Sequence, residues 1–324
     1  MCGQTSISYS EMLRPQPEYN SHGQDELMPL TETEASVLQE LEAMIGEQIP
    51  LAKQFGGPSA STFYRTAYTE FEGHIEYLSI NKKGLSDLPD GVGDLEAIKY
   101  LYLRDNHLQT IPSCVCKLET LLDLDVFNNE ILDIPRAVSG MTSLQRADLS
   151  RNMFEYLPDS IGQLTYLRRL GLMNVQLMEL PETIGELGNL WDLAIFINEL
   201  TALPESIGEM SSLQRLAAHK NELASLPKSI GRLQSLTQLS LSNNKLAALP
   251  NSIGDLLSLE SLAVDGNQLT ALPDSIIKLV GLQSVNLSKN NFTAFPPKSA
   301  KWLENLESNG CRIKMDNRHR GLLI

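Results

Sequence analysis

Arginines recur at regular intervals in the middle of this sequence, among aromatic residues at related positions. Arg146, Arg169 and Arg215 fall at multiples of one fixed spacing. The apolar residues at comparable positions are Tyr100, Tyr102, Phe127, Met173, Trp191, Phe196 and Ile197. Arginine with exposed aromatic side chains, and few lysines or glutamates, is typical of the centre of a protein–protein interface. These residue types therefore indicate recognition of another protein.

Carboxylates in the same region suggest a second chemistry. Asp123, Asp125 and Asp148 would face one another if the regular spacing brings their segments side by side, and such a group can perform general acid–base catalysis. Arg146 is adjacent to them, so a salt-bridged cluster is the favoured interpretation. The sequence contains no glycine-rich phosphate loop and no HExxH, GxSxG or CxxC pair. We therefore predict a non-enzymatic protein with no cofactor.

The cysteines and histidines give little sign of a metal site. Cys114 and Cys116 form a CxC pair without a second pair, whereas tetrahedral zinc needs four ligands. We interpret them as small residues packed on the outer side of the fold. His219 stands alone, with no second histidine or cysteine nearby. No metal ligand is predicted.

A repeat organises all these positions. The segment LTQLSLSNNKLAALPNSIGDL, residues 236–256, returns with different polar residues every 23 positions in both directions. One position of this unit reads Lys83, Asn106, Asn129, Asn152, Val175, Asn198, Asn221, Asn244, Asn267 and Asn290. Ten gapless copies of an LxxLxLxxNxL core constitute the leucine-rich repeat signature.

Each unit predicts a short strand, a turn and a return segment. Leu239 and Leu241 alternate inward, so the residues between them face outward. The Asn244 amide can satisfy backbone groups in the turn, and the glycine of the return segment, Gly254, allows a tight bend. Stacked units give an α/β solenoid with a curved parallel β-sheet on the concave face and short helical or irregular turns on the convex face. Ten strands at about 4.8 Å spacing make a concave floor roughly 45 Å long.

The outward strand positions are where function can be encoded, because packing dictates the inward ones. They are bland in the last three repeats, such as Gln238, Ser240 and Ser242, but not in repeats two to seven. The predicted partner-binding residues there are Tyr100, Tyr102, Arg104, Asp123, Phe127, Arg146, Arg169, Met173, Trp191, Asp192, Phe196, Arg215 and His219. On a chain of net charge −14, the arginine row would be a local positive feature suited to an acidic partner surface.

Four segments are expected along the chain. Residues 1–30 are a disordered tail, and 31–74 form an N-terminal cap with a helix that starts at Thr31 and stops at Gly46, followed by a hairpin whose first strand covers 62–71. Residues 75–296 hold ten repeats. Residues 297–324 form a C-terminal cap with a helix to 309–310 and a strand at 311–315, and the basic residues at 318–320 are expected to form a solvated tail.

Charge and hydropathy exclude other classes of partner. A pI near 4.8 argues against nucleic acid and anionic membranes. No apolar run reaches the ~20 residues that span a bilayer, so no membrane insertion is expected. The segment 1–30 holds no secretory signal, and neither end has a cluster of cysteines for a disulfide cap. These features predict a cytoplasmic protein.

The LPxSIGxLxxLxxLxLxxNxL unit, clearest at 203–208 and 249–254, resembles the cytosolic leucine-rich repeat proteins of the Ras-group and Shoc-2-like kind. The resemblance implies a non-enzymatic scaffold, and some members bind small GTPases or phosphatase subunits on the concave face. The shared motif is the packing template, so this choice of partner does not carry over. The chain departs from the pattern at Lys83 and Val175, and at the inward positions Ala147 and Ala218. Because Val175 cannot continue a ladder of asparagines, a local irregularity is predicted in the fifth repeat.

The leading hypothesis is an interaction scaffold, possibly in intracellular signalling, that binds a folded protein on the concave face of repeats two to seven. The alternative is a receptor-like module for a peptide or small ligand, with Trp191 and Phe196 as its stacking floor. A more distant alternative is a regulatory subunit of an enzyme.

Overall fold

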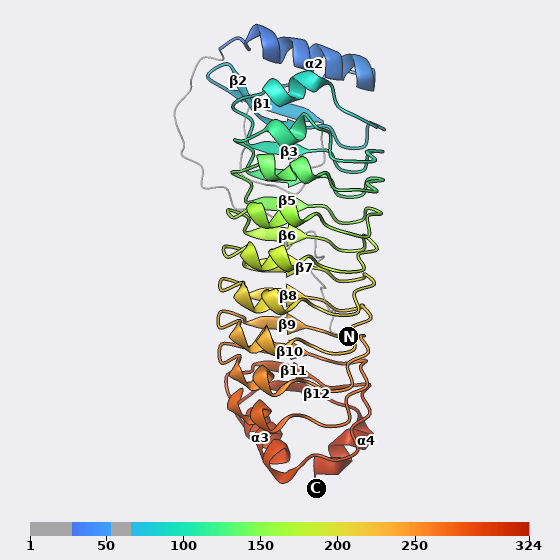
Figure 1. Ribbon diagram of the computed structural model, residues 1–324, viewed down its shortest axis with the longest axis vertical. Helices are drawn as coiled ribbons and strands as arrows, with labels where there is room; N and C mark the ends of the chain where they lie inside the picture. Colours follow the sequence, from blue (N-terminus) through green and yellow to red (C-terminus); the bar gives the residue numbers. More distant parts are fainter. Residues whose placement is uncertain (1–27, 53–65, 324) are drawn as a thin grey trace.

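The computed structural model describes residues 28–52 and 66–323 as one elongated stack of coils, with helix α2 at one end and α3 and α4 at the other (Figure 1). Most of the predicted tail lies outside the described residues. So do positions 62–65, which were expected to begin the first strand.

The strands form a single open sheet of twelve members in sequence order. The first pair is antiparallel, and all later pairs are parallel. The strands are β1 (Ala67–Phe71), β2 (His74–Ser79), β3 (Tyr100–Tyr102), β4 (Asp123–Asp125), β5 (Arg146–Asp148), β6 (Arg169–Gly171), β7 (Asp192–Ala194), β8 (Arg215–Ala217), β9 (Gln238–Ser240), β10 (Ser261–Ala263), β11 (Ser284–Asn286) and β12 (Arg312–Lys314). From β3 to β11, paired residues are 23 positions apart, as Leu216 and Leu239 are. Equivalent residues of successive repeats therefore form straight columns across the sheet.

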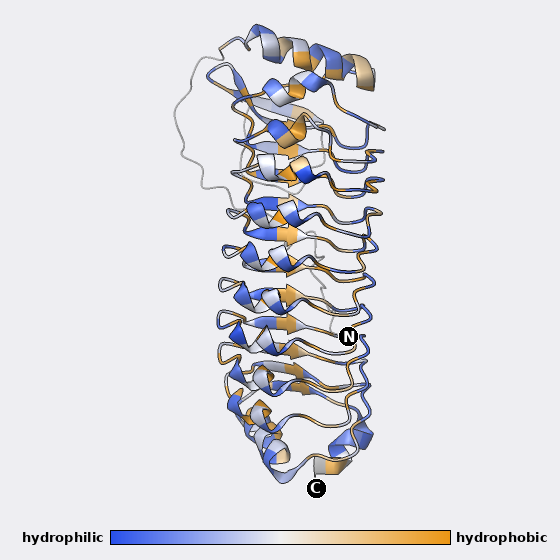
Figure 2. Ribbon diagram, viewed as in Figure 1, coloured by the Kyte–Doolittle hydropathy of each residue, from blue (hydrophilic) through white to orange (hydrophobic). Residues whose placement is uncertain are grey.

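The core runs the length of the stack, as predicted. Leu239, Leu241 and Leu246 of one repeat are at most 1% exposed, and the return segment adds the fully buried Ile253. Figure 2 shows the hydrophobic residues mainly along the strands in the middle of the stack and hydrophilic residues along its edges. Because each repeat buries its leucines only against its neighbours, the whole array forms one continuous core.

A ladder of asparagines holds the turns after the strands. The Asn244 amide donates to the carbonyl oxygens of Ala218 and Leu241 at 3.0 and 2.9 Å. Its oxygen accepts the Leu223 N–H at 3.1 Å. This confirms the predicted role of the asparagine.

The residue before the asparagine position of each repeat has a left-handed backbone conformation. Its φ lies between 54° and 67° at Lys82, Asp105, Asn128, Arg151, Asn174, Ile197, Lys220, Asn243, Gly266 and Lys289. Glycine and asparagine adopt this conformation readily, but β-branched residues do so rarely. Ile197 is therefore an unfavourable choice for its backbone.

The predicted irregularity at Val175 is present. Here the Val175 N–H donates to Asn198 Oδ1 at 2.9 Å, and the next residue, Gln176, has an additional left-handed φ of 71°. The other departure behaves alike: the Lys83 N–H donates to Asn106 Oδ1 at 2.9 Å, and Gly84 has φ 68°. Loss of the asparagine thus switches the turn to a second geometry.

The convex face carries 3-10 helices. They are η1 (Asp90–Asp94), η2 (Val115–Lys117), η3 (Arg136–Gly140), η4 (Asp159–Gln163), η5 (Glu182–Glu186), η6 (Glu205–Glu209), η7 (Lys228–Arg232), η8 (Asn251–Asp255) and η9 (Asp274–Lys278). The glycine in these helices was expected to allow a tight bend, but Gly254 does not have a left-handed φ, so its backbone conformation alone does not require glycine. A Cβ on Gly254 would lie 2.2 Å from the Ser275 carbonyl oxygen. The glycine is needed because the next coil passes too close for a side chain.

Helices close both ends. In α2 (Glu32–Ile45), Thr31 accepts the Glu34 N–H as N-cap and Gly46 ends the helix with φ 71°, as predicted. At the other end, α3 (Pro297–Ser308) and β12 confirm the predicted helix and strand. The buried Trp302 donates from Nε1 to the Leu279 carbonyl at 3.1 Å and so ties α3 to the last repeats.

The basic end of the chain is helical rather than a free tail, although Arg318 and Arg320 are exposed as expected. Residues 317–323 form α4 (Asn317–Arg320) and η10 (Gly321–Leu323). His319 is only 1% exposed, and its ring lies edge-on to Phe292 with centroids 5.5 Å apart. Arg318 donates to the Asn290 carbonyl at 2.7 Å. These residues are therefore part of the cap.

Candidate functional site

The outward strand positions line up in columns on the concave face, as the repeat predicts. The first column of repeats two to seven contains Tyr100, Asp123, Arg146, Arg169, Asp192 and Arg215. The second contains Tyr102, Asp125, Asp148, Gly171, Ala194 and Ala217. A third set follows directly after the strands and contains Arg104, Phe127, Ser150, Met173, Phe196 and His219. Twelve of the thirteen predicted site residues belong to these three sets, which together with Trp191 we call the concave patch. Trp191, the thirteenth, immediately precedes β7 and lies at the edge of the patch.

Aspartates within the sheet compensate the predicted positive row. Arg146 Nη1 lies 3.6 Å from Asp123 Oδ2, and Arg215 Nη1 lies 3.8 Å from Asp192 Oδ2. Each pair joins adjacent strands. The arginine row is therefore not the net positive feature expected from reading arginines alone.

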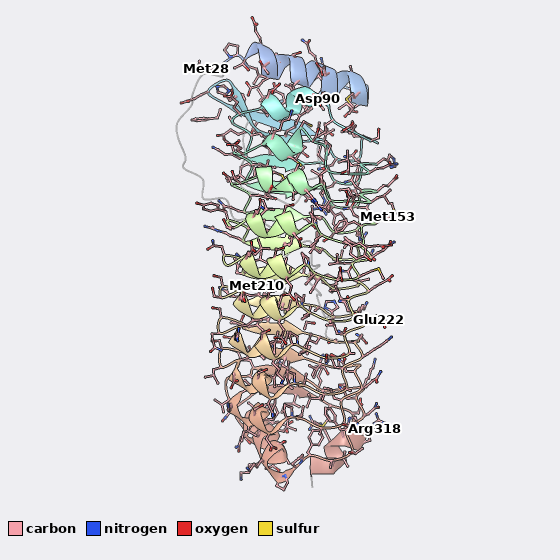
Figure 3. All side chains as sticks on the ribbon, viewed as in Figure 1. Met28, Asp90, Met153, Met210, Glu222 and Arg318 are labelled. Carbon is pink, nitrogen blue, oxygen red and sulfur yellow. The ribbon has the colours of Figure 1, made fainter. Side chains whose placement is uncertain are left out.

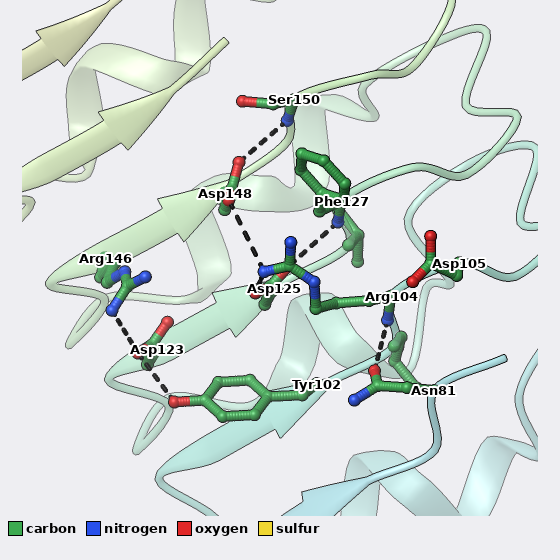
Figure 4. A network of polar contacts seen from close by, with 12 residues as sticks. Asn81, Tyr102, Arg104, Asp105, Asp123, Asp125, Phe127, Arg146, Asp148 and Ser150 are labelled. Carbon is green, nitrogen blue, oxygen red and sulfur yellow. Dashed lines mark hydrogen bonds and ion pairs between the residues drawn. The ribbon is translucent and has the colours of Figure 1, made fainter. Parts of the chain in front are cut away.

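A buried network fills the concave patch at repeats two to four (Figure 4). Arg104 Nη1 lies 2.5 Å from Asp125 Oδ2 and 4.0 Å from Asp148 Oδ2. Tyr102 donates its hydroxyl proton to Asp123 Oδ2 at 3.0 Å. The structure confirms the salt-bridged interpretation of this acidic cluster.

Burial dominates the ionisation of the cluster. It raises the pKa of Asp125 to about 7, since Arg104 only partly opposes the desolvation and Asp148 adds to the rise. Burial also raises the pKa of Asp123, against the lowering effect of Arg146. The side chains of Asp123, Asp125 and Asp148 are at most 8% exposed. Carboxylates so enclosed expose little surface to any molecule outside the fold.

Two aromatic residues that were predicted to be exposed are buried. Tyr102 is 4% exposed, with its ring edge-on to Tyr77 at a centroid distance of 5.3 Å. Phe196 is 6% exposed and stacks on the His219 ring at 4.3 Å. Arg104, Asp123 and Asp192 are also buried. Side chains from neighbouring strands cover these positions although they point outward.

The accessible part of the concave patch is smaller than predicted. Its half-buried members are Tyr100, Phe127, Arg146, Arg169, Met173, Trp191, Arg215 and His219. The Arg169 guanidinium lies 4.1 Å over the Trp191 ring, and that of Arg104 lies 4.2 Å over Phe127. Because Arg104 is buried, the Arg169–Trp191 pair is the stack that the surface presents, and arginine on an aromatic ring is common at protein interfaces.

Pairing between adjacent strands within one column is what the residue-by-residue interpretation missed. Asp192 lies between Arg169 and Arg215 in one column, one repeat away from each of them. Comparing neighbouring registers would have revealed this alternation of charge. The turn edge, including Arg151, whose guanidinium lies 5.2 Å from the Phe127 ring centroid, was also left out of the predicted site.

Metal and membrane sites receive no support from the described residues. Within 28–52 and 66–323, no group of three or more His, Cys, Asp or Glu side chains is placed to hold a metal ion. Cys114 and Cys116 are buried with free thiols, and burial raises the pKa of both. In the same part of the chain, no helix is long and apolar enough to cross a bilayer.

Family comparisons identify the repeats. A family described as "Leucine-rich repeat region" matches residues 152–244, and "Leucine Rich Repeat" matches 97–118 and 235–256. No curated protein gives a significant match to the chain.

Solved structures share the architecture. A leucine-rich repeat protein of Leptospira interrogans is 35% identical with a TM-score of 0.67, over 73% of this chain and 59% of its own. The leucine-rich repeat ectodomain of an Arabidopsis thaliana receptor kinase, GASSHO1/SCHENGEN3, in complex with CASPARIAN STRIP INTEGRITY FACTOR 2, is 25% identical with a TM-score of 0.66, over 83% and 34%. The Drosophila Toll–Spätzle complex gives 25% identity and a TM-score of 0.65, over 75% and 33%. The chain therefore spans less than two thirds of each of these structures.

Proposed function

We propose that this leucine-rich repeat protein is a non-enzymatic scaffold that binds a folded partner protein on the concave face of repeats two to seven. The observation that carries the proposal is the Arg169–Trp191 stack at the edge of the concave patch. It is half-buried, so it keeps part of its surface for a partner. Arginine and tryptophan are among the residue types most enriched in binding hot spots.

The charge pairing changes the kind of partner proposed. Because Asp123 and Asp192 compensate Arg146 and Arg215, the patch offers little net charge to an acidic surface. A partner with a mixed aromatic and polar surface fits better than a strongly acidic one. Family resemblance alone points to a small GTPase or a phosphatase subunit in a cytoplasmic signalling assembly, and because only the packing template is shared, it does not select between them and other folded proteins.

Peptide binding is the second candidate. Some similar structures are receptors in complex with peptides, such as a plant peptide hormone receptor at 24% identity. On the concave patch, the Phe196 ring that was expected to form a stacking floor is covered by His219. This favours a broad protein surface over a peptide slot at that position.

The test compares two variants in the same column. Trp191→Ala removes the aromatic half of the stack, and Thr237→Ala truncates the equivalent residue two repeats further on, outside repeats two to seven. Arg146 is a poor choice because it is 13% exposed and paired with Asp123, so its reversal would damage the fold. The tagged full-length protein and both variants are used for affinity capture from cell extract, with mass spectrometry and thermal unfolding in parallel.

A partner captured by the parent and by Thr237→Ala but lost from a folded Trp191→Ala would support the concave interface. If the two variants capture the same proteins in equal amounts, the proposal fails.

A further inference from the structure

A hollow of about 510 Å³ lies at the turn edge of repeats three to six, next to the concave patch. This volume is in the range of about 300–1,000 Å³ that is usual for ligand-binding pockets. Its lining includes the apolar side chains of Met153, Met173 and Ile197 and the amides of Asn128, Asn174 and Gln176. Figure 3 shows Met153 projecting along the same edge of the stack as Glu222.

The hollow coincides with the altered turn of the fifth repeat. Gln176, whose left-handed backbone marks that turn, is one of its lining residues. An asparagine at position 175 would accept the Phe154 N–H, as Asn244 accepts that of Leu223. Val175 has no side-chain acceptor and cannot do so. The hollow therefore lies where the regular turn geometry is interrupted.

Ile197 is the residue that points to a ligand. It is β-branched, yet it has φ 58° and is 37% exposed at the hollow. The backbone strain is not balanced by burial of the side chain within the chain. An outlier of this kind is a ground for inferring a function that needs the side chain.

Positions 107, 130, 153, 176, 199, 222 and 245 form a column along this edge. On both sides of the hollow, charged members of this column form ion pairs with each other. His107 Nδ1 contacts Glu130 Oε1 at 2.6 Å, and Lys245 pairs with Glu222 at the equivalent positions. Between these pairs the column holds Met153 and Gln176, followed by Glu199, which does not line the hollow. Two uncharged residues thus interrupt the charged column at the hollow, although Glu130 and Arg151 also belong to its lining. Methionine adapts well to varied apolar partners.

The charged groups in the lining are engaged elsewhere. The Glu130 carboxylate contacts His107, and the Arg151 guanidinium lies 5.2 Å from the centroid of the Phe127 ring. The remaining lining residues are apolar or carry neutral amides.

Two of these amides have unused hydrogen-bonding capacity. The side chains of Asn174 and Gln176 make no hydrogen bond to any residue in the described ranges, and both are exposed. Each can donate and accept, which matches the N–H and C=O groups of a peptide backbone. Neither amide offers a counter-charge to an ionised ligand.

From these observations we propose that the hollow binds an extended, uncharged polypeptide segment of a partner, which inserts one long apolar side chain between Met153, Met173 and Ile197. The amides of Asn174 and Gln176 bind the backbone of that segment. The hollow shares Met173 with the concave patch but contains neither Arg169 nor Trp191, so Trp191→Ala and Ile197→Asn test the two proposals separately.

The test uses the full-length protein with ¹³C-labelled methionine and isoleucine methyl groups. The probes are two pools of acetylated and amidated nonapeptides. In the first, Leu or Met is fixed at the fifth position and all other positions are Ser, Thr, Asn, Gln, Ala or Val. In the second, the fifth position is Asp or Lys. We expect the first pool to shift the methyl resonances of Met153, Met173 and Ile197, while the equally exposed Ile277 stays unchanged.

Matched variants separate the site from general effects. Ile197→Asn is expected to weaken peptide binding at least tenfold while its midpoint of thermal unfolding stays level or rises, because asparagine tolerates the left-handed φ. Gln176→Ala is expected to weaken binding as well, whereas Gln268→Ala, at the same repeat position four coils later, should leave it unchanged.

Several outcomes would overturn the proposal. They are an absence of shifts, equal shifts with the second pool, and equal loss of binding in Gln176→Ala and Gln268→Ala. Shifts at these methyl groups that depend on protein concentration without peptide would assign the hollow to a second copy of the chain instead.

Discussion

Replacing Gly208 with alanine should force two coils of the stack apart. A Cβ at this position would lie 2.4 Å from the Ser229 carbonyl oxygen and 2.6 Å from Ser229 Cβ. Ordinary contact begins near 3.4 Å, so the coils must separate by 3.4 − 2.4 = 1.0 Å or distort. The nearest atom belongs to the backbone, which cannot rotate away as a flexible side chain can.

The expected loss of stability follows from two opposing effects. Overpacking of a tight contact usually costs about 1–3 kcal/mol. Alanine also stabilises relative to glycine by about 0.4–1 kcal/mol, because the unfolded chain loses freedom. With a backbone contact this short, we expect a net decrease of about 2 kcal/mol in the free energy of unfolding.

Gly188 provides the matched control in the preceding coil. It has no left-handed φ, and a Cβ there would meet no atom within 4 Å. Gly188→Ala should therefore be neutral or stabilising by up to about 1 kcal/mol. Urea unfolding followed by circular dichroism measures both variants, with the slope of the transition checked for constancy. If Gly208→Ala is as stable as Gly188→Ala, close approach of the coils does not explain the glycine column.

Three further predictions concern buried polar groups. Asn244→Ala should lower the free energy of unfolding by about 2–4 kcal/mol in urea titrations, because the Leu223 N–H and two carbonyl groups lose their partners; an unchanged midpoint would contradict the ladder. Burial raises the pKa of Asp125 to about 7, so the folded state binds more protons than the unfolded state between about pH 4 and 7. The free energy of unfolding should fall as pH rises through that window and level off above it, and Asp125→Asn should flatten this dependence. Burial raises the pKa of Cys114 and raises that of Cys116 to about 11. Both thiols should therefore react with a disulfide reagent at pH 7.5 only when the protein unfolds. Fast labelling of these two thiols in the native protein would contradict this prediction.

Periodicity made most of the fold predictable. The constant repeat length places Leu216 beside Leu239 whatever the polar residues between them, because stacking fixes the register of every strand. Even the disturbed turn at Val175 followed from the chemistry of one missing amide. Each of these features depends on contacts that every repeat makes with its neighbours in the same way.

The left-handed position before the asparagine was less predictable. Glycine occupies it only at Gly266, while Arg151 and Ile197 take the same conformation. The reason is that the stack dictates the backbone: the Arg151 N–H donates to the Met173 carbonyl at 2.7 Å, and the Ile197 N–H to that of His219 at 3.0 Å. Local preference is overruled by hydrogen bonds to the next coil.

Exposure on the concave face could not be obtained from side-chain direction alone. Tyr102 and Phe196 point outward, but strands lie about 4.8 Å apart, so long side chains reach across to neighbouring columns and cover them. The exposure of such a side chain depends on the equivalent residues of the repeats on either side. A repeat unit examined in isolation does not contain that information.

Stability and function can be separated here by asking what each unusual residue gains within the chain. Arg146 on the concave face looks functional in the sequence, yet its side chain is 13% exposed and forms an ion pair with Asp123. The Ile197 N–H donates to the His219 carbonyl, but no such contact accounts for its side chain, which stays partly in solvent on a strained backbone. A residue that lowers stability, and whose side chain no contact within the chain explains, indicates a binding role more strongly than a residue that packs well against its neighbours. The turn edge is therefore as strong a candidate for partner recognition as the concave face, and the response of Ile197→Asn to peptide and to heat decides whether that reasoning holds.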